Sequence, residues 1–253
     1  MPGVSGPARQ AAALGGLGVP AYADPLTAPD EWAELARPGT PLHWVVLNVS
    51  GSPGTRADPG YAHAAGRLRE AGVRVLGRLD MAYGARTLGE LIGDAQHYLD
   101  WYRVDGFYLD RAPADRALLA ACRRVTGTLG ELSGAGDGRG GDRHLVLGHG
   151  THPHPGYAEA ADQLVTFNGR WSDYRWSETP QWTADCPPEK FCHLVHGVPR
   201  PHLETALRIA RWQGAGSVFV TDRDGIAGTD PFEGLPTYWR DLASILRDRP
   251  WLA

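Results

Sequence analysis

The sequence predicts a single-domain α/β protein in which eight parallel strands close into a TIM-type (β/α)8 barrel. Short apolar runs alternate with longer helical patterns along almost the whole chain, which is typical of parallel β/α units. Eight such units fit into 253 residues, a common length for one closed barrel. An open doubly wound sheet is the alternative fold.

The apolar runs give the predicted barrel strands in chain order. These are residues 17–22, 43–49, 73–80, 106–110, 144–148, 163–168, 192–196 and 217–222. Helical patterns follow most of them. The predicted helices are residues 29–37, 59–71, 87–102, 114–132, 199–213 and 235–247, with one short helix within 156–161 and an irregular aromatic segment at 171–182.

Local signals mark several helix ends. Asp58 precedes Pro59, as expected of an N-cap followed by proline in the first turn. Gly72 and Gly214 each follow a helical pattern, where glycine readily adopts the left-handed conformation that ends a helix. The glycine-rich stretch 134–141 is expected to be a loop on the face opposite the site.

Composition excludes several classes of function. The formal net charge is −4 and no basic block is present, which disfavours nucleic-acid binding. No run of about 18 apolar residues occurs, so we expect no membrane span. Residues 1–16 predict a disordered N-terminal tail before a barrel domain at 17–253, and they lack the pattern of a signal peptide. As written, the chain is expected to be cytoplasmic, and secreted only if the true start lies upstream.

The cysteines and glycines indicate no cofactor. Cys186 and Cys192 are close enough in sequence for a disulfide, but free thiols are expected in a cytoplasmic chain. No glycine-rich phosphate loop and no closely spaced cysteine pair typical of zinc is present. We therefore predict neither a cofactor nor a metal. Nothing in the sequence specifies an oligomeric state.

Polar and aromatic residues follow the predicted strand ends, where (β/α)8 barrels place their chemistry. Asp110 closes the fourth strand and Asp80 the third, and we expect both carboxylates to be catalytic because these two strands are neighbours in the predicted barrel. The predicted substrate-binding residues are Tyr22, Asn48, Tyr83, Arg86, Arg111, His149, Asn168, Trp171 and Asp222. Such a mixture suits a carbohydrate, because sugar rings stack on aromatic side chains and hydroxyls bond to polar ones.

Several of these residues also have a structural interpretation. Asp80 can form an ion pair with Arg78 or Arg86, and Asn48 can cap the turn that follows it. The aromatic residues of 171–182 can form a stacking platform or fasten a long loop to the barrel.

The chain resembles spherulation-specific family 4. The similarity runs in order from residue 17 to 240 and is carried by the motifs VPAY (19–22), LNVSGSPG (47–54), GRLDMAYGAR (77–86), YRVDG (102–106) followed by Asp110, and VTD (220–222). The family has a (β/α)8 barrel, and its characterised members include glycoside hydrolases acting on α-1,4-linked galactosamine-type polysaccharides. The resemblance therefore implies a barrel related to those enzymes and a carbohydrate partner.

The sequence departs from the family pattern where carboxylates are expected. Arg111 stands where the family has Glu after its Asp, and Asn168 stands in place of Glu in the family's Phe-Glu-Gly. Arg78 replaces a Tyr and Met81 a Thr, so only Asp110 transfers directly. Arg111 is expected to pair with a carboxylate and lower its pKa.

Three functions follow from these patterns. The first is a glycoside hydrolase-like barrel that acts on or binds an amino-sugar-containing glycan, with Asp110 central to the cleft. The second is a non-catalytic carbohydrate-binding pseudoenzyme. The third is a metal-assisted hydrolase using His149, His152 and His154, although the rings of a proline-broken loop are expected to diverge.

Overall fold

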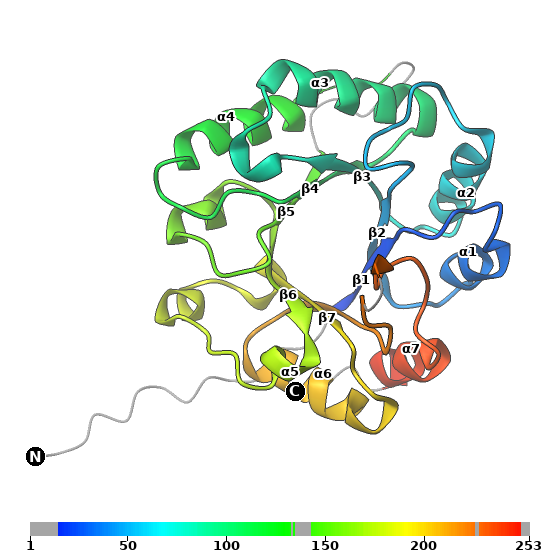
Figure 1. The fold of residues 1–253 in the computed structure, drawn as a ribbon, viewed down its shortest axis with the longest axis vertical. Coiled ribbons are helices and arrows are strands. Elements are labelled where there is room, and N and C mark those ends of the chain that lie inside the picture. The colour runs from blue at the N-terminus through cyan, green and yellow to red at the C-terminus, as the bar shows by residue number, and fades with distance from the viewer. Residues whose placement is uncertain (1–14, 133, 135–142, 226–227, 249–253) are drawn as a thin grey trace, which may run out of the picture.

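Eight parallel strands form a closed barrel in chain order, as predicted. The computed structural model describes residues 15–132, 134, 143–225 and 228–248. Viewed along the barrel, the strands form an inner ring with helices around it (Figure 1). The predicted N-terminal tail lies outside the described residues except for its last two, and Gly16 already belongs to the first strand. Most of the predicted loop 134–141 also lies outside them.

The strands agree closely with the predicted runs. They are β1 (Gly16–Ala21), β2 (Leu42–Leu47), β3 (Val75–Asp80), β4 (Gly106–Asp110), β5 (His144–Gly148), β6 (Gln163–Arg170), β7 (Phe191–His196) and β8 (Ser217–Val220). Most of their side chains are buried, because the barrel interior covers one face and the helices the other.

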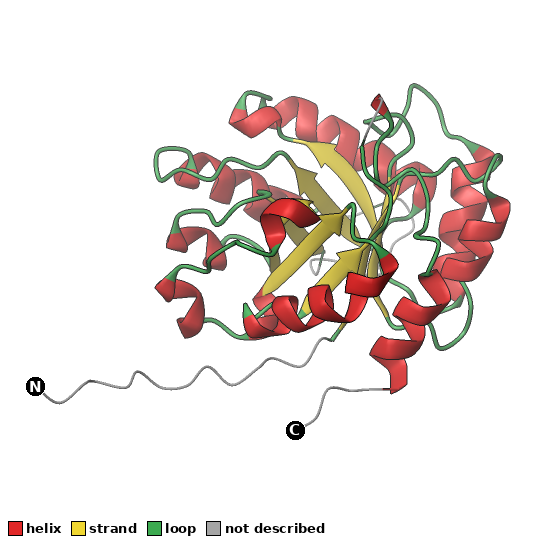
Figure 2. Cartoon of the chain, turned by 60° about the horizontal axis from the view of Figure 1, so that its bottom comes forward, coloured by secondary structure: helices red, strands yellow, loops and turns green. Residues whose placement is uncertain are grey.

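Helices cover six of the eight units. They are α1 (Pro29–Leu35), α2 (Pro59–Glu70), α3 (Leu88–His97) with the π-helix η2 (Tyr98–Tyr102), α4 (Leu119–Gly130), α6 (Leu203–Trp212) and α7 (Trp239–Asp248). The side view in Figure 2 shows the helices packed along the outside of the strands. The Asp58 cap is confirmed, since its side chain accepts hydrogen bonds from the backbone of Gly60 and Tyr61.

Two connections contain no full helix in segments that the structure describes throughout. Between β5 and β6 lies the 3-10 helix η3 (Pro155–Glu159). Between β6 and β7 lie the single turn α5 (Trp171–Tyr174) and the 3-10 helices η4 (Gln181–Asp185) and η5 (Pro188–Lys190). Two further 3-10 helices, η1 (Ala82–Gly84) and η6 (Arg200–His202), lie in other loops.

Aromatic side chains fill the barrel interior and glycines make room for them. Trp44 is fully buried, and its indole N–H donates to Gln163 Oε1 at 2.7 Å. Its ring lies 5.8 Å from that of Tyr108. A Cβ on Gly18 would lie 2.4 Å from the Trp44 ring, and one on Gly148 would lie 2.7 Å from the Tyr108 hydroxyl. These two glycines are therefore required by packing.

Phe232, in the loop between β8 and α7, packs over the barrel end at β1, β7 and β8. Its ring lies 6.0 Å from Tyr22, 6.0 Å from Phe219 and 6.4 Å from His196. Phe232 is 7% exposed. It therefore fills this side of the mouth, whereas the ends of β3 and β4 lie away from it.

Two predictions on chain chemistry can be compared with the structure. All three cysteines are free thiols, as expected for Cys186 and Cys192. Within the described ranges, no helix is long and apolar enough to cross a membrane.

Candidate functional site

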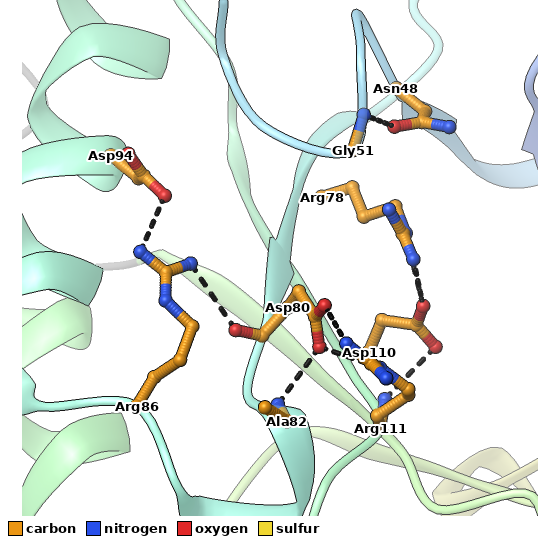
Figure 3. A network of polar contacts seen from close by, with 9 residues as sticks. All are labelled: Asn48, Gly51, Arg78, Asp80, Ala82, Arg86, Asp94, Asp110 and Arg111. Carbon is orange, nitrogen blue, oxygen red and sulfur yellow. Dashed lines mark hydrogen bonds and ion pairs between the residues drawn. The ribbon is translucent and has the colours of Figure 1, made fainter.

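The ends of β3 and β4 bring four charged side chains together (Figure 3). The two strands pair in register with Asp80 beside Asp110 and Arg78 beside Tyr108. Side chains alternate along a strand, so Arg78 and Asp80 point to the same side of β3, and Asp110 shares that side on β4. We call Arg78, Asp80, Asp110 and Arg111 the charge cluster.

Asp110 is held by Arg78 of the neighbouring strand. Arg78 Nε donates to Asp110 Oδ2 at 3.0 Å, and Nη2 donates to the same oxygen. The other oxygen accepts the backbone N–H of Arg111 at 2.9 Å. Both side chains are largely buried, at 16% and 18% exposure, and the Arg78 guanidinium lies 5.5 Å from the centre of the Tyr22 ring. Burial opposes the charge of Arg78, but Tyr22 and Asp110 more than offset it and raise the pKa of Arg78.

Asp80 is held by Arg111. Arg111 Nε donates to Asp80 Oδ1 at 2.8 Å, and Nη2 donates to Oδ2. The N–H of Ala82 also donates to Oδ1, at 2.8 Å. Partial burial would raise the pKa of Asp80, but these hydrogen bonds and the charge of Arg111 outweigh it and hold the pKa below its ordinary value. Arg111 was expected to pair with a carboxylate, and its partner is Asp80.

Left-handed backbone at three non-glycine residues shapes the loops beside the charge cluster. Ala82, Tyr83 and Arg111 have φ of 44°, 57° and 49°. The loops are tied by hydrogen bonds from Tyr83 N to Arg111 O at 2.7 Å and from Met81 N to Asp110 O at 2.8 Å. Such conformations cost about 1–3 kcal/mol each and concentrate at functional sites. The result is a Tyr83 ring that is 62% exposed beside the Arg111 guanidinium, 5.7 Å away.

Arg86 has partners on the side of the cluster next to α3. Its Nη2 donates to Asp94 Oδ2 at 2.9 Å, and its Nη1 donates to the backbone oxygen of Asp80 at 3.3 Å. Figure 3 shows Arg86 between these two groups. It therefore supports the loop that carries Asp80 and Tyr83.

Two other predicted binding residues have partners in their own loops. Asn48 Oδ1 accepts the N–H of Gly51 at 2.8 Å, which is the turn-capping role considered from the sequence. Asp222 accepts the N–H of Thr237 at 3.1 Å and also its hydroxyl. Asn168, by contrast, is exposed near the end of β6.

His149 and Trp171 are buried against the barrel wall. His149 is 7% exposed, and neither ring nitrogen makes a hydrogen bond with a described residue. Burial lowers its pKa to about 4, an effect that the backbone of Pro113 and Ala112 only partly offsets. Trp171 is 9% exposed and stacks on His202 at 5.6 Å. Trp171 therefore fastens its loop, which is the second of the two interpretations considered.

The histidine loop does not assemble a metal-ligand set within the described part of the chain. No group of three or more His, Cys, Asp or Glu side chains there is placed to hold an ion. His154 instead accepts the N–H of Gly156 through Nδ1 at 3.2 Å. The metal-assisted alternative thus gains no support from the geometry.

Two residues at the barrel mouth were absent from the predicted site. Arg78 was visible in the sequence, since it lies two residues before Asp80 and must share its side of the strand. Phe232 had no such signal, because it lies in a loop whose path depends on packing against Tyr22 and His196.

A closed eight-stranded barrel with this charge cluster, an exposed aromatic ring and an amide near its strand ends defines a single-domain protein of the (β/α)8-barrel class. The family model of spherulation-specific family 4 matches residues 17–246. The chain therefore belongs to that family, which confirms the resemblance seen in the sequence.

Two relatives illustrate the match. Spherulin-4 of Physarum polycephalum is 25% identical over 238 residues, covering 90% of this chain and 69% of the relative. The crystal structure of Aspergillus clavatus Sph3 in complex with GalNAc superposes with a TM-score of 0.79 at 24% identity, covering 93% of this chain and 98% of Sph3. At this identity the second comparison shows the shared fold.

Proposed function

We propose that this protein binds an amino-sugar-containing glycan at the barrel mouth and does not hydrolyse it by a two-carboxylate mechanism. The observation that carries the proposal is that both carboxylates of the charge cluster form ion pairs with arginines. Arg78 pairs with Asp110, and Arg111 pairs with Asp80. The GalNAc in the crystal structure of Sph3, a protein with the same fold, supports an amino sugar as the ligand.

The exposed part of the site suits sugar recognition. Tyr83 offers a ring that is 62% exposed, and sugar rings stack on such faces. Arg111 is 46% exposed, so its guanidinium can donate to hydroxyl or acetamido oxygens beside that ring. Asn168, exposed near the end of β6, can both donate and accept hydrogen bonds.

The same contacts oppose glycoside hydrolysis. A general acid must hold a proton near neutral pH, yet the pKa of Asp80 is held below its ordinary value chiefly by Arg111. Asp110 already accepts three hydrogen bonds, two from Arg78 and one from the backbone of Arg111. Asn168 has no ionisable proton to transfer.

Hydrolysis is the second candidate function. The strand register that sets Asp80 directly beside Asp110 favours it, because hydrolysis needs two carboxyl groups on neighbouring positions around the scissile bond. Asp110 would then act as nucleophile or base. Asp80 would act as the acid, and its ion pair with Arg111 would have to break when substrate binds.

Calorimetric titration tests binding. We expect saturable binding of GalNAc and of short α-1,4-linked galactosamine oligomers by the wild-type protein. Asp110→Asn should weaken it about tenfold, or ~1.4 kcal/mol, because Arg78 loses its charged partner. Asp241→Asn is the matched control, since Asp241 also forms an ion pair with an arginine, Arg200, but lies on the outer helix α7. Failure to bind any amino sugar contradicts the glycan proposal.

A reducing-end assay on the same oligomers separates the two candidates. We expect no cleavage by the wild-type protein. Cleavage that disappears in Asp110→Asn, while the Asp241→Asn control retains it, would establish hydrolysis and overturn the non-catalytic proposal.

A further inference from the structure

An apolar cavity of about 210 Å³ lies between the start of α3, one face of α4 and the loops that follow β3 and β4. It is distinct from the glycan surface, which faces the barrel mouth. Its apolar walls are formed by Met81, Leu88, Pro113, Leu118, Cys122 and Val125. Two of these, Met81 and Cys122, are almost completely buried at 2% and 1% exposure.

The walls carry no negative charge. None of the ten described residues that line the cavity is acidic. Burial raises the pKa of the Cys122 thiol to about 12, so the thiol is protonated and behaves as a small apolar group. An apolar molecule would therefore meet no negative charge on the cavity wall.

Two arginines stand at the cavity, Arg86 and Arg124. Arg86 is held by Asp94 and by the backbone oxygen of Asp80. Arg124 is exposed, and no hydrogen bond or ion pair joins its guanidinium to a residue that the structure describes. A guanidinium that no described residue pairs, beside an apolar cavity, is complementary to an amphipathic anion.

A glycine on the lining leaves room in the cavity. Gly84 has a φ of 92°, and a Cβ there would lie 3.1 Å from Leu118 Cδ1, so a side chain at this position would be strained and would narrow the cavity. Leu88 is 37% exposed although it lines the cavity. Its apolar surface is available to a bound molecule.

We propose that this cavity binds a small monocarboxylic acid with a compact apolar body, with its carboxylate on Arg124. An apolar protein cavity of about 150 Å³ holds a benzene molecule, so 210 Å³ accommodates one six-membered ring with a carboxylate beside Arg124. Benzoate is the probe that matches this size and charge. The site is independent of the glycan surface, and its test does not depend on sugar binding.

Calorimetry on the full chain compares benzoate with benzamide, which has the same shape and no charge. We expect saturable benzoate binding, with benzamide about tenfold weaker. Arg124→Gln should weaken benzoate about tenfold and leave benzamide unchanged. Arg123→Gln is the matched control, since the neighbouring Arg123 pairs with Glu159 and does not line the cavity. Ala121→Phe, which places a ring in the cavity, should abolish both.

Thiol labelling gives a second readout. A small thiol reagent followed by mass mapping should label Cys122 more slowly when benzoate is present, while Cys186, outside the cavity, is labelled at an unchanged rate. Retention of binding by a folded Ala121→Phe variant, equal binding of benzoate and benzamide, or unchanged Cys122 labelling would each overturn the proposal.

Discussion

Arg111 combines an ion pair with an unfavourable backbone conformation. Its side chain holds Asp80, its carbonyl oxygen accepts the N–H of Tyr83, and its φ is 49°. A left-handed backbone costs a non-glycine residue about 1 kcal/mol or more, so the loop contacts must offset that cost. The residue thus links the position of Tyr83 to the charge state of Asp80.

Substitutions at Arg111 separate these two effects. Arg111→Ala and Arg111→Gly both remove the ion pair, but glycine adopts a positive φ without strain. We expect Arg111→Gly to be more stable than Arg111→Ala by about 1 kcal/mol, measured as the free energy of unfolding in urea. A free energy of unfolding of Arg111→Ala equal to or greater than that of Arg111→Gly would show that the backbone at this position is not strained.

The sequence was sufficient to place the carboxylates but not to pair them. Strand alternation and neighbouring strand order set Asp80 and Asp110 side by side, as the register confirms. Arg111 pairs with Asp80 because its backbone is left-handed. The sequence contains no signal that predicts this conformation. The sequence also did not distinguish the buried Trp171 from an exposed stacking ring, because its burial depends on packing against His202.

The strands were the most predictable elements of this barrel, and its connections the least. All eight strands fall on the predicted apolar runs, because burial on both faces leaves a continuous apolar signal. The helix predicted over 114–132 begins only at Leu119, since Asp115 Oδ1 accepts the N–H of Leu118 and holds the preceding turn. The connections around β6 contain only short helical turns, where the sequence predicts one short helix within 156–161 and an irregular aromatic segment at 171–182.

The interior of β1 and β2 depends on one glycine. Because a Cβ on Gly18 would lie 2.4 Å from the fully buried Trp44 ring, Gly18→Ala must displace that ring. We expect a loss of about 1–3 kcal/mol in the free energy of unfolding, together with a change in Trp44 fluorescence.

The control for this substitution is Gly93→Ala. Gly93 lies within α3, and a Cβ there would meet nothing within 4 Å. Alanine should stabilise that helix by about 0.5–1 kcal/mol. If Gly18→Ala is as harmless as Gly93→Ala, the barrel interior is less tightly packed than its contacts indicate.

Buried histidines set the pH dependence of the whole molecule. Burial lowers the pKa of His149 to about 4 and that of His193 to about 3. The pKa of a histidine in the unfolded chain is about 6.5. The unfolded chain therefore takes up protons first as the pH falls. The stability these histidines provide is complete above about pH 7 and decreases progressively from about pH 6.5 towards pH 4.

Urea unfolding at pH 8, 7, 6 and 5 measures this decrease. His149 alone should contribute roughly 3 kcal/mol over its full range, so His149→Phe should flatten the curve. Asp80, whose pKa is lowered chiefly by Arg111 against the effect of burial, loses its contribution only below about pH 4. A stability that stays constant or rises between pH 7 and 5 would contradict this account.

The arrangement of the charge cluster also limits how far its electric field reaches. On β3 the positive Arg78 comes before the negative Asp80. At the end of β4 the order is reversed, since the negative Asp110 comes before the positive Arg111. The two dipoles oppose each other, so the cluster forms a quadrupole whose potential decays steeply with distance. Such a site attracts no ion from afar, and a neutral sugar should bind with the same affinity in dilute and in concentrated salt.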